Sequence, residues 1–201
     1  MIKVTDFRNA MSMLTSAVNV ITTAGVSGRY GFTASAVCGV TDTPPTLLVC
    51  MNKASRSHGH FVENKILTVN VLGAQHQQIS NAFSSQMSPE QRFEYGNWTA
   101  LHTGAPVLTD ALVSFDCQIE QIQEVGTHSI FICPIVAIQH SQQEQDQQDQ
   151  DQQDHGQQQQ GLAYFNRAYH SIGHHDTGDQ NTGHQNIEQQ AGQHTNQAEI
   201  A

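Results

Sequence analysis

GFTASAVCGVTDTPPTLLVCMN, residues 31–52, is the stretch that decides the fold of this chain. It joins small residues, a polar turn with Pro44 and Pro45, and an apolar run from Thr46 to Met51. Proline fixes its own φ and makes the residue before it extended, so the double proline predicts a sharp turn directly before a strand. A hairpin of small residues packed in a barrel is the commoner outcome of such a pattern, and a ligand-binding loop is the alternative.

The ligand interpretation depends on two kinds of residue in this stretch. Backbone N–H groups and hydroxyls at a turn can bind a ligand, and small side chains let a flat group approach the main chain. The hydroxyl side chains are Thr33, Ser35, Thr41 and Thr43, and the small residues are Ala34, Ala36 and Gly39.

The next segment, NKASRSHGHF at 52–61, has the composition of a phosphate-binding loop. Lys53 and Arg56 supply positive charge next to short polar side chains, which suits a single phosphate monoester. A helix that begins near Ser57 would add free N–H groups. A polar loop before a helix is the alternative. His58 and His60 lack a third ligand nearby, so we expect no metal site.

Apolar runs rich in β-branched residues predict strands at 19–23, 46–51, 66–72, 112–120 and 129–139. Thr5 or Asp6 is a candidate cap for a first helix, and 77–83 is a candidate short helix. The segment 87–108, with its glycines and prolines, is expected to be an irregular excursion in which Trp98 belongs to the core. This pattern predicts a mainly β fold with peripheral helices.

Charge is concentrated in two segments. Of 18 acidic residues, five lie in 141–160 and four in 173–201, where no Lys or Arg occurs. The remaining nine acidic residues and all eight basic residues lie in the rest of the chain, which therefore carries about −1 of the total charge of −10. Nothing resembles the basic stripe of a nucleic-acid-binding protein. The four cysteines, without a CxxC spacing, are expected to be buried free thiols.

Residues 141–160 contain no apolar side chain, so they cannot bury surface against the entropy of ordering. We expect a disordered Gln/Asp-rich insert at 141–160, a disordered Gln/His-rich tail at 173–201, and one domain made of 1–140 plus 161–172. The start of the chain lacks a hydrophobic signal region and no run reaches about 18 apolar residues. A cytoplasmic, non-membrane protein is therefore expected.

Several motifs, in order, resemble the short-chain flavin reductases, split-barrel enzymes that supply reduced flavin to a partner monooxygenase. Besides residues 31–52, they are FRNAMSMLTSAVNVITT (7–23), LTVNVL (67–72), ALVSFDCQIEQIQEVGTHSIFIC (111–133) and GLAYFNRAYH (161–170). GFTASAVC, TDTPPTLLVC, ALVSFDC and VGTH are most similar to the branch that serves pyrimidine utilisation. The branch that serves 4-hydroxyphenylacetate 3-monooxygenase comes second. A long insert before GLAYFNRAYH departs from the family pattern.

The resemblance implies a split β-barrel of the FMN-binding flavin reductase-like type and an NADH:FMN oxidoreductase. FMNH2 would pass, by diffusion or transient contact, to a flavin-dependent monooxygenase of pyrimidine (uracil) degradation, and the reductase would be a homodimer. The alternatives are the reductase component of a 4-hydroxyphenylacetate-type aromatic hydroxylase and a non-catalytic flavin-binding module. No GxGxxG follows a strand, so NADH would bind without a Rossmann fold.

The resemblance also implies site residues. His128, in the GTH motif, would lie beside nicotinamide and flavin, although a lone histidine at a strand end is more often structural. Asn70 would contact the flavin edge, or else satisfy backbone groups of the barrel. The other cofactor-binding candidates are Thr33, Ala34, Ser35, Ala36, Thr41, Cys50, Met51, Asn52, Lys53, Ser55 and Arg56, and the nicotinamide-side candidates are Tyr164, Arg167 and Tyr169.

Overall fold

The computed structural model of the protein describes residues 2–141 and 159–173. Most of the insert expected at 141–160 and nearly all of the tail expected at 173–201 lie outside the described residues. Among the residues that the structure describes, no helix has the length and apolar character needed to cross a membrane.

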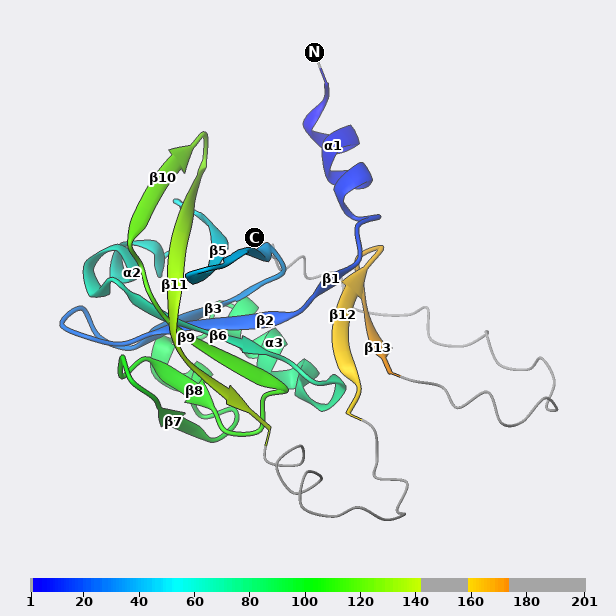
Figure 1. The fold of residues 1–201 in the computed structure, drawn as a ribbon. Helices are drawn as coiled ribbons and strands as arrows, with labels where there is room; N and C mark the ends of the chain where they lie inside the picture. Colours follow the sequence, from blue (N-terminus) through cyan, green and yellow to red (C-terminus); the bar gives the residue numbers. More distant parts are fainter. Residues whose placement is uncertain (1, 142–158, 174–201) are drawn as a thin grey trace, which may run out of the picture.

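An antiparallel sheet of eight strands curls into a half-barrel and forms the body of the molecule (Figure 1). Seven strands follow the order β3-β2-β6-β9-β11-β5-β4, and β10 pairs with β11. This architecture confirms the predicted mainly β split barrel. The strands are β2 (Asn19–Thr23), β3 (Tyr30–Ala34), β4 (Val37–Asp42), β5 (Pro45–Asn52), β6 (Ile66–Val71), β9 (Val113–Gln118), β10 (Gln121–Val125) and β11 (His128–His140).

Residues 31–52 form both edges of this sheet. β3 ends the strand order on one side and β4 ends it on the other, so the chain crosses the split of the barrel at Ser35 and Ala36. The backbone N–H of Cys50 donates to the carbonyl of Ala36 at 3.0 Å, which holds the crossing against β5. The predicted proline turn is present: the Thr43–Pro44 peptide bond is cis and β5 starts at Pro45.

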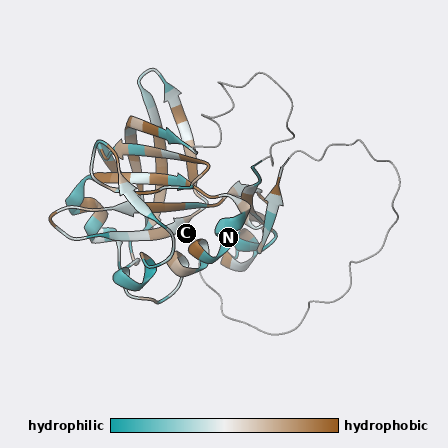
Figure 2. Cartoon of the chain, turned by 90° about the horizontal axis from the view of Figure 1, so that it is seen from below, coloured by the Kyte–Doolittle hydropathy of each residue, from teal (hydrophilic) through white to brown (hydrophobic). Residues whose placement is uncertain are grey.

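The core has two parts. Phe32, Val49, Phe61 and Phe131 pack with other apolar residues inside the barrel. A second cluster, which includes Phe83, packs helix α3 (Gln77–Ser84) against the sheet. Figure 2 shows many of the hydrophobic residues on the strands, as expected when apolar burial drives the packing of a half-barrel.

The expectation that all four cysteines are buried is wrong for Cys38, because it lies on the exposed edge strand β4. Cys50 is half-buried. Burial, and to a smaller extent the nearby Cys38, raises the pKa of the Cys50 thiol. Cys117 and Cys133 are buried as expected, and burial raises the pKa of Cys133 to about 12. All four are free thiols.

The first helix, α1 (Val4–Met11), differs from its prediction in its cap. The N-cap position is Lys3 and has no side-chain cap bond, so Thr5 and Asp6 lie inside the first turn. None of its residues is buried, and Figure 1 shows it projecting from the barrel. The other short elements are α2 (His58–Asn64), η1 (Ala74–His76), α4 (Pro89–Arg92), β7 (Trp98–Ala100) and β8 (Pro106–Leu108), so 87–108 is more regular than predicted.

The GLAYFNRAYH motif forms a hairpin. β12 (Gly161–Phe165) and β13 (Ala168–Ile172) pair antiparallel, and β1 (Ser16–Ala17) completes a separate three-stranded sheet. Asn166 and Arg167 connect the strands with φ of 48° and 61°. Two successive positive φ values are typical of the tight turns that match the twist of paired strands.

Candidate functional site

One end of the 52–61 loop lies beside the GTH motif. Asn52 on β5 is the register partner of His128 on β11, and the backbone N–H of Lys53 donates to the carbonyl of Thr127 at 2.9 Å. The Lys53 ammonium forms an ion pair of 3.0 Å with Glu124 on β10. The structure therefore brings the predicted phosphate loop and the predicted nicotinamide histidine together, with the charge of Lys53 already neutralised.

The other end of the loop faces a different segment. Arg56 Nη2 donates to Gln86 Oε1 at 2.8 Å, and the helix expected near Ser57 begins at His58. Arg92, at the end of α4, reaches the same region. Together they form part of a pocket of about 260 Å³ whose lining residues are Tyr30, Arg56, Ser57, His60, Met87, Pro89 and Arg92.

Arg92 is held firmly in this pocket but keeps unused donors. Its Nη1 donates to the Gly31 carbonyl and its Nη2 to the Ser85 carbonyl, both at 2.7 Å, while the buried Nε has no partner. Burial, and then the charge of Arg56, lowers the pKa of the Arg92 guanidinium. Within residues 2–141 and 159–173, neither arginine forms an ion pair. The pocket thus holds positive charge without a compensating carboxylate.

The small-residue stretch divides into buried and accessible positions. Thr33 is buried and donates its hydroxyl to the Ser80 carbonyl at 2.6 Å, and the side chains of Ala34 and Met51 pack in the barrel core. Ser35 and Ala36 are half-buried at the crossing between the sheet edges. A ligand at the split can therefore reach Ser35 and Ala36 but not the buried side chains of Thr33 and Ala34. Of the remaining candidates, Cys50 and Ser55 are half-buried and Thr41 is exposed.

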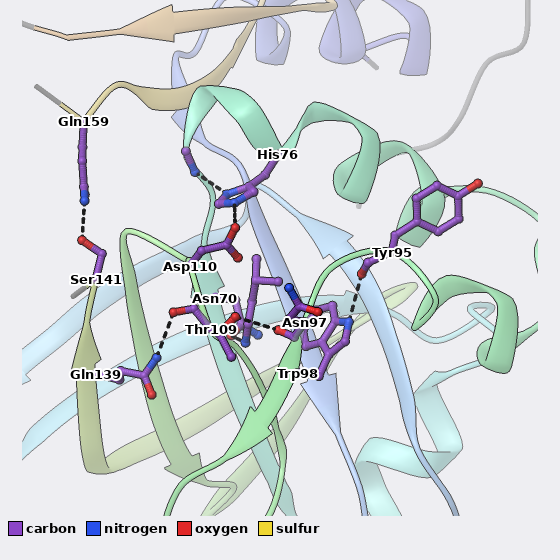
Figure 3. Close-up of polar contacts among 12 residues, drawn as sticks. Asn70, His76, Tyr95, Asn97, Trp98, Thr109, Asp110, Gln139, Ser141 and Gln159 are labelled. Carbon is purple, nitrogen blue, oxygen red and sulfur yellow. Dashed lines mark hydrogen bonds and ion pairs between the residues drawn. The ribbon is translucent and has the colours of Figure 1, made fainter. Parts of the chain in front are cut away.

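Asn70 is fully buried and uses its whole amide inside the protein (Figure 3). Its Nδ2 donates to the Val20 carbonyl at 3.0 Å and to Thr22 Oγ1 at 3.3 Å. Its Oδ1 accepts from the Leu108 N–H at 2.8 Å and from Ser114 Oγ at 2.9 Å. An amide with two donors and one oxygen has little left to offer a ligand. These contacts favour the barrel interpretation of Asn70 over contact with the flavin edge.

The nicotinamide-side candidates do not form one group within the chain. Tyr169 Oη lies 2.8 Å from Ser80 Oγ, and its ring meets that of Tyr164 edge-on at 5.4 Å. Arg167 lies at the tip of the β12–β13 turn. His128 begins β11 of the eight-stranded sheet, whereas β12 and β13 belong to the separate three-stranded sheet.

Sequence reasoning missed Arg92, although a signal for it exists. Ser88 and Gln91 form a reciprocal capping box, in which the Gln91 N–H donates to Ser88 Oγ at 3.3 Å and the Ser88 N–H donates to Gln91 Oε1 at 3.0 Å. The pattern Ser-Pro-Glu-Gln is typical of a helix start. It therefore predicts a short helix at this place, and Arg92 is the last residue of that helix. Trp98 is half-buried and packs against the second core cluster through the Phe83 and Phe93 rings, which fits the core expectation, and its Nε1 donates to the Tyr95 carbonyl at 2.9 Å (Figure 3).

The two histidines of the HxH pattern face different partners. His58 Nε2 lies 2.9 Å from Ser129 Oγ, and its ring stacks on Phe131. His60 stacks on Tyr30 with ring centroids 3.4 Å apart. Burial lowers the pKa of His58, with Glu124 acting in the opposite direction.

Residues 11–173 match the family model described as the flavin reductase like domain. The chain belongs to this family. Among its relatives, FMN reductase (NADH) RutF of Pantoea ananatis (strain LMG 20103) is 56% identical over 134 residues, which are 67% of this chain and 70% of that protein. The protein of the same name from Acinetobacter baylyi (strain ATCC 33305 / BD413 / ADP1) is 55% identical over 136 residues, 68% of this chain and 72% of that protein.

Solved structures of flavin reductases share the fold. A crystal structure described as a flavin reductase of Haemophilus somnus 129PT has a TM-score of 0.76 at 48% identity and covers 85% of this chain and 100% of that chain. Flavin reductase PheA2 has a TM-score of 0.70 at 26% identity and covers 85% of this chain and 99% of that chain. The expected flavin reductase fold is therefore confirmed.

Proposed function

We propose that this member of the flavin reductase family is an NADH-dependent FMN reductase that releases FMNH2. The similarity to relatives named FMN reductase (NADH) RutF carries the proposal, with 56% identity over 134 residues in one of them. The site geometry supports it, because the half-buried crossing at Ser35 and Ala36 directly follows β3, and the Gly31 carbonyl of β3 accepts from Arg92 in a pocket that also contains Arg56.

The cofactors supply the hydride chemistry, with transfer from nicotinamide C4 to flavin N5, and the protein orients them. The main chain of Ser35 and Ala36 contacts the edge of the flavin ring, and Asn52, Lys53, Ser55 and Arg56 bind the phosphate. His128 positions the nicotinamide; its Nδ1 lies 2.9 Å from Thr127 Oγ1, which leaves Nε2 for the ligand.

The proposed recipient of FMNH2 is a flavin-dependent monooxygenase of pyrimidine degradation. A coupled assay tests it: the purified reductase is mixed with NADH, FMN and either a uracil-oxidising or a 4-hydroxyphenylacetate-oxidising oxygenase. Freely diffusing FMNH2 would support both oxygenases equally, whereas transfer during transient contact favours the dedicated partner. We expect a faster rate or tighter coupling with the uracil enzyme. Equal coupling with both would contradict a dedicated pyrimidine partner.

We propose that the reductase acts as a homodimer. Phe7 and Leu14 at the N-terminal segment are each 58% exposed, and an amphipathic helix with no buried residue is favourable only when another surface covers it. Sedimentation of the full chain is expected to give a dimer, and Phe7→Ser is expected to shift it towards monomer.

A spectrophotometric assay tests the activity itself. Mixing the full chain with NADH and FMN is expected to deplete NADH absorbance only when both are present. A folded protein that binds FMN without consuming NADH would be a flavin-binding module instead.

His128→Ala is expected to lower kcat/KM for NADH by about tenfold, roughly 1.4 kcal/mol of transition-state stabilisation, while FMN affinity stays the same. His102→Ala is the matched control, because His102 is an exposed histidine outside the GTH motif. Unchanged kcat/KM for NADH in His128→Ala would remove His128 from the site.

A further inference from the structure

The turn before His128 makes few contacts of its own. Figure 1 shows the β10–β11 hairpin projecting from the barrel, and every residue of β10 is exposed. At the turn, Gly126 has a φ of 56°, and a Cβ atom placed there would meet nothing within 4 Å. β5 pairs with β11 only as far as His128. Because a two-stranded hairpin is only marginally stable by itself, contacts from the segment after β5 decide how firmly this turn is held.

Three contacts join the hairpin to the segment after β5. The Lys53 N–H donates to the Thr127 carbonyl at 2.9 Å, and the Lys53 ammonium pairs with Glu124 at 3.0 Å. The third contact joins His58 Nε2 to Ser129 Oγ over 2.9 Å. The ion pair involves side chains that are 34% and 70% exposed, so solvent weakens it. Ser129 is fully buried, and loss of its partner would leave a buried hydroxyl without that hydrogen bond.

The His58 ring is fixed from its other side by the barrel core. It stacks on Phe131 with ring centroids 5.9 Å apart and an angle of 25° between the planes, and Phe131 is fully buried. His58 is also the first residue of α2, and its N–H donates to the Ser55 carbonyl at 3.0 Å. The ring therefore links a rigid part of the core to the residue that directly follows His128.

The hydrogen bond between His58 and Ser129 forms without a buried charge. Burial lowers the pKa of His58 below its ordinary value; of the two charged groups that face the ring, Glu124 raises this pKa and Lys53 lowers it. His58 is therefore neutral at neutral pH. A neutral imidazole has one nitrogen that donates and one that accepts, and a hydroxyl can do either, so the two groups match.

We infer that His58 is a positioning residue of the reductase: through Ser129 it holds the neighbouring His128 in the orientation that receives the nicotinamide. This inference rests on the proposed function, in which His128 orients NADH. The His128 ring is held on its Nδ1 side by Thr127 Oγ1 at 2.9 Å, so movement of the strand at Ser129 moves the ring. Because a small displacement of an orienting group is enough to slow a reaction, His58 acts without touching NADH.

Two substitutions at His58 separate the hydrogen bond from the ring stack. His58→Phe keeps an aromatic ring against Phe131 and removes the nitrogen that faces Ser129, whereas His58→Gln carries a side-chain amide in its place. We expect His58→Phe to lower kcat/KM for NADH about fivefold, the effect of one lost hydrogen bond, and His58→Gln to recover most of it. The Kd for FMN should stay the same in both. An unchanged kcat/KM in His58→Phe, an equal loss in both variants, or a raised Kd for FMN would overturn the inference.

A double variant shows whether His58 acts through His128. In a His128→Ala protein the orienting ring is already gone, so adding His58→Phe should lower kcat/KM for NADH no further. Losses that multiply would indicate a general effect on the structure and would overturn the positioning role. His102→Phe is the matched control, because His102 is an exposed histidine outside both α2 and the β10–β11 hairpin, and it should leave kcat/KM unchanged.

Hydrogen exchange tests the same role without turnover. Amide exchange of residues 121–131 is measured by mass spectrometry on the full chain without NADH. We expect faster exchange in His58→Phe than in wild type and near wild-type exchange in His58→Gln, with β6 unchanged in all three. That result in a protein that consumes no NADH would mean that the proposed function fails while His58 still holds the hairpin. Active reductase with equal exchange in all three proteins would leave the function in place and overturn the inference.

Discussion

Two polar clusters of this molecule each combine side chains from distant segments, but they differ in how completely their hydrogen-bonding groups are satisfied. The cluster around Asn70 and the pocket of Arg56 and Arg92 each gather side chains from distant segments. At Asn70 every amide group finds a protein partner and no surface is exposed (Figure 3). At Arg92 the protein satisfies two nitrogens and leaves the third without a partner.

The difference teaches how to separate structural from functional polar groups. Buried polar groups in folded proteins are nearly always satisfied, so a saturated cluster contributes to stability and has nothing to give to a ligand. A cluster that keeps unused donors and uncompensated charge is unfavourable until a ligand completes it. Substitutions at Asn70 are therefore expected to change stability, and substitutions at Arg56 are expected to change binding.

The largest expected effect is on the free energy of unfolding, and it tests the structural role of Asn70. Asn70→Ala removes an amide that serves the Val20 carbonyl and the Leu108 N–H, and it leaves these buried groups unpaired. We expect the free energy of unfolding to fall by about 3 kcal/mol in urea titrations. Asn97→Ala, at an exposed asparagine nearby, should stay within about 0.5 kcal/mol of wild type.

The same variant can break the contrast. If Asn70→Ala folds with near wild-type stability and loses FMN affinity, Asn70 belongs to the flavin site and the saturated cluster is not purely structural.

A smaller effect is expected for Lys53→Gln. The Lys53 ammonium is paired with Glu124 at 3.0 Å and both side chains are partly exposed, so the ion pair contributes at most about 1 kcal/mol to stability. Because its charge is already neutralised, KM for FMN should rise less than in Arg56→Gln. Parallel kinetics of the two variants decide this. A larger rise for Lys53→Gln would show that Lys53 contributes more than Arg56 to binding of the phosphate.

The smallest expected effect is the pH dependence that His58 contributes. Burial lowers the pKa of His58 in the folded state, and Lys53 adds to the lowering while Glu124 opposes it. The unfolded chain, with a pKa of about 6.5, therefore binds more protons at mildly acidic pH, and stability falls as pH decreases below about 6.5. Chemical unfolding across this range should show a shallower loss in His58→Gln than in wild type. An equal slope would assign the pH dependence to other groups.

The sequence anticipated those features that depend on neighbouring residues. The prolines at 44 and 45 predicted the turn before β5, and β-branched runs predicted β2, β6 and β11. The cap of α1 was wrong because Lys3 takes the cap position and no side chain caps the helix. Cys38 was placed in the core because its apolar neighbours suggested burial, yet it lies on an edge strand that only one other strand covers.

The candidate site was anticipated in part. The order of motifs indicated that Asn52 and His128 belong to one region, and their register across β5 and β11 places them side by side. Asn70 had two open interpretations from sequence, and only its hydrogen-bond partners favour one of them. Arg92 was missed, since its meaning depends on a pocket that a linear sequence does not display.

The amino-acid sequence by itself determined the strands, the proline turn and the flavin reductase family, because backbone preferences and motif order are properties of adjacent residues. Tertiary structure decided which charged groups are already satisfied. Lys53 pairs with Glu124, and Arg56 and Arg92 line one pocket, only in the folded chain, because the two members of each set are far apart in the sequence. Electrostatic pairing depends on distance in space, so only the folded chain distinguishes a lysine in an ion pair from two arginines that form none among the described residues.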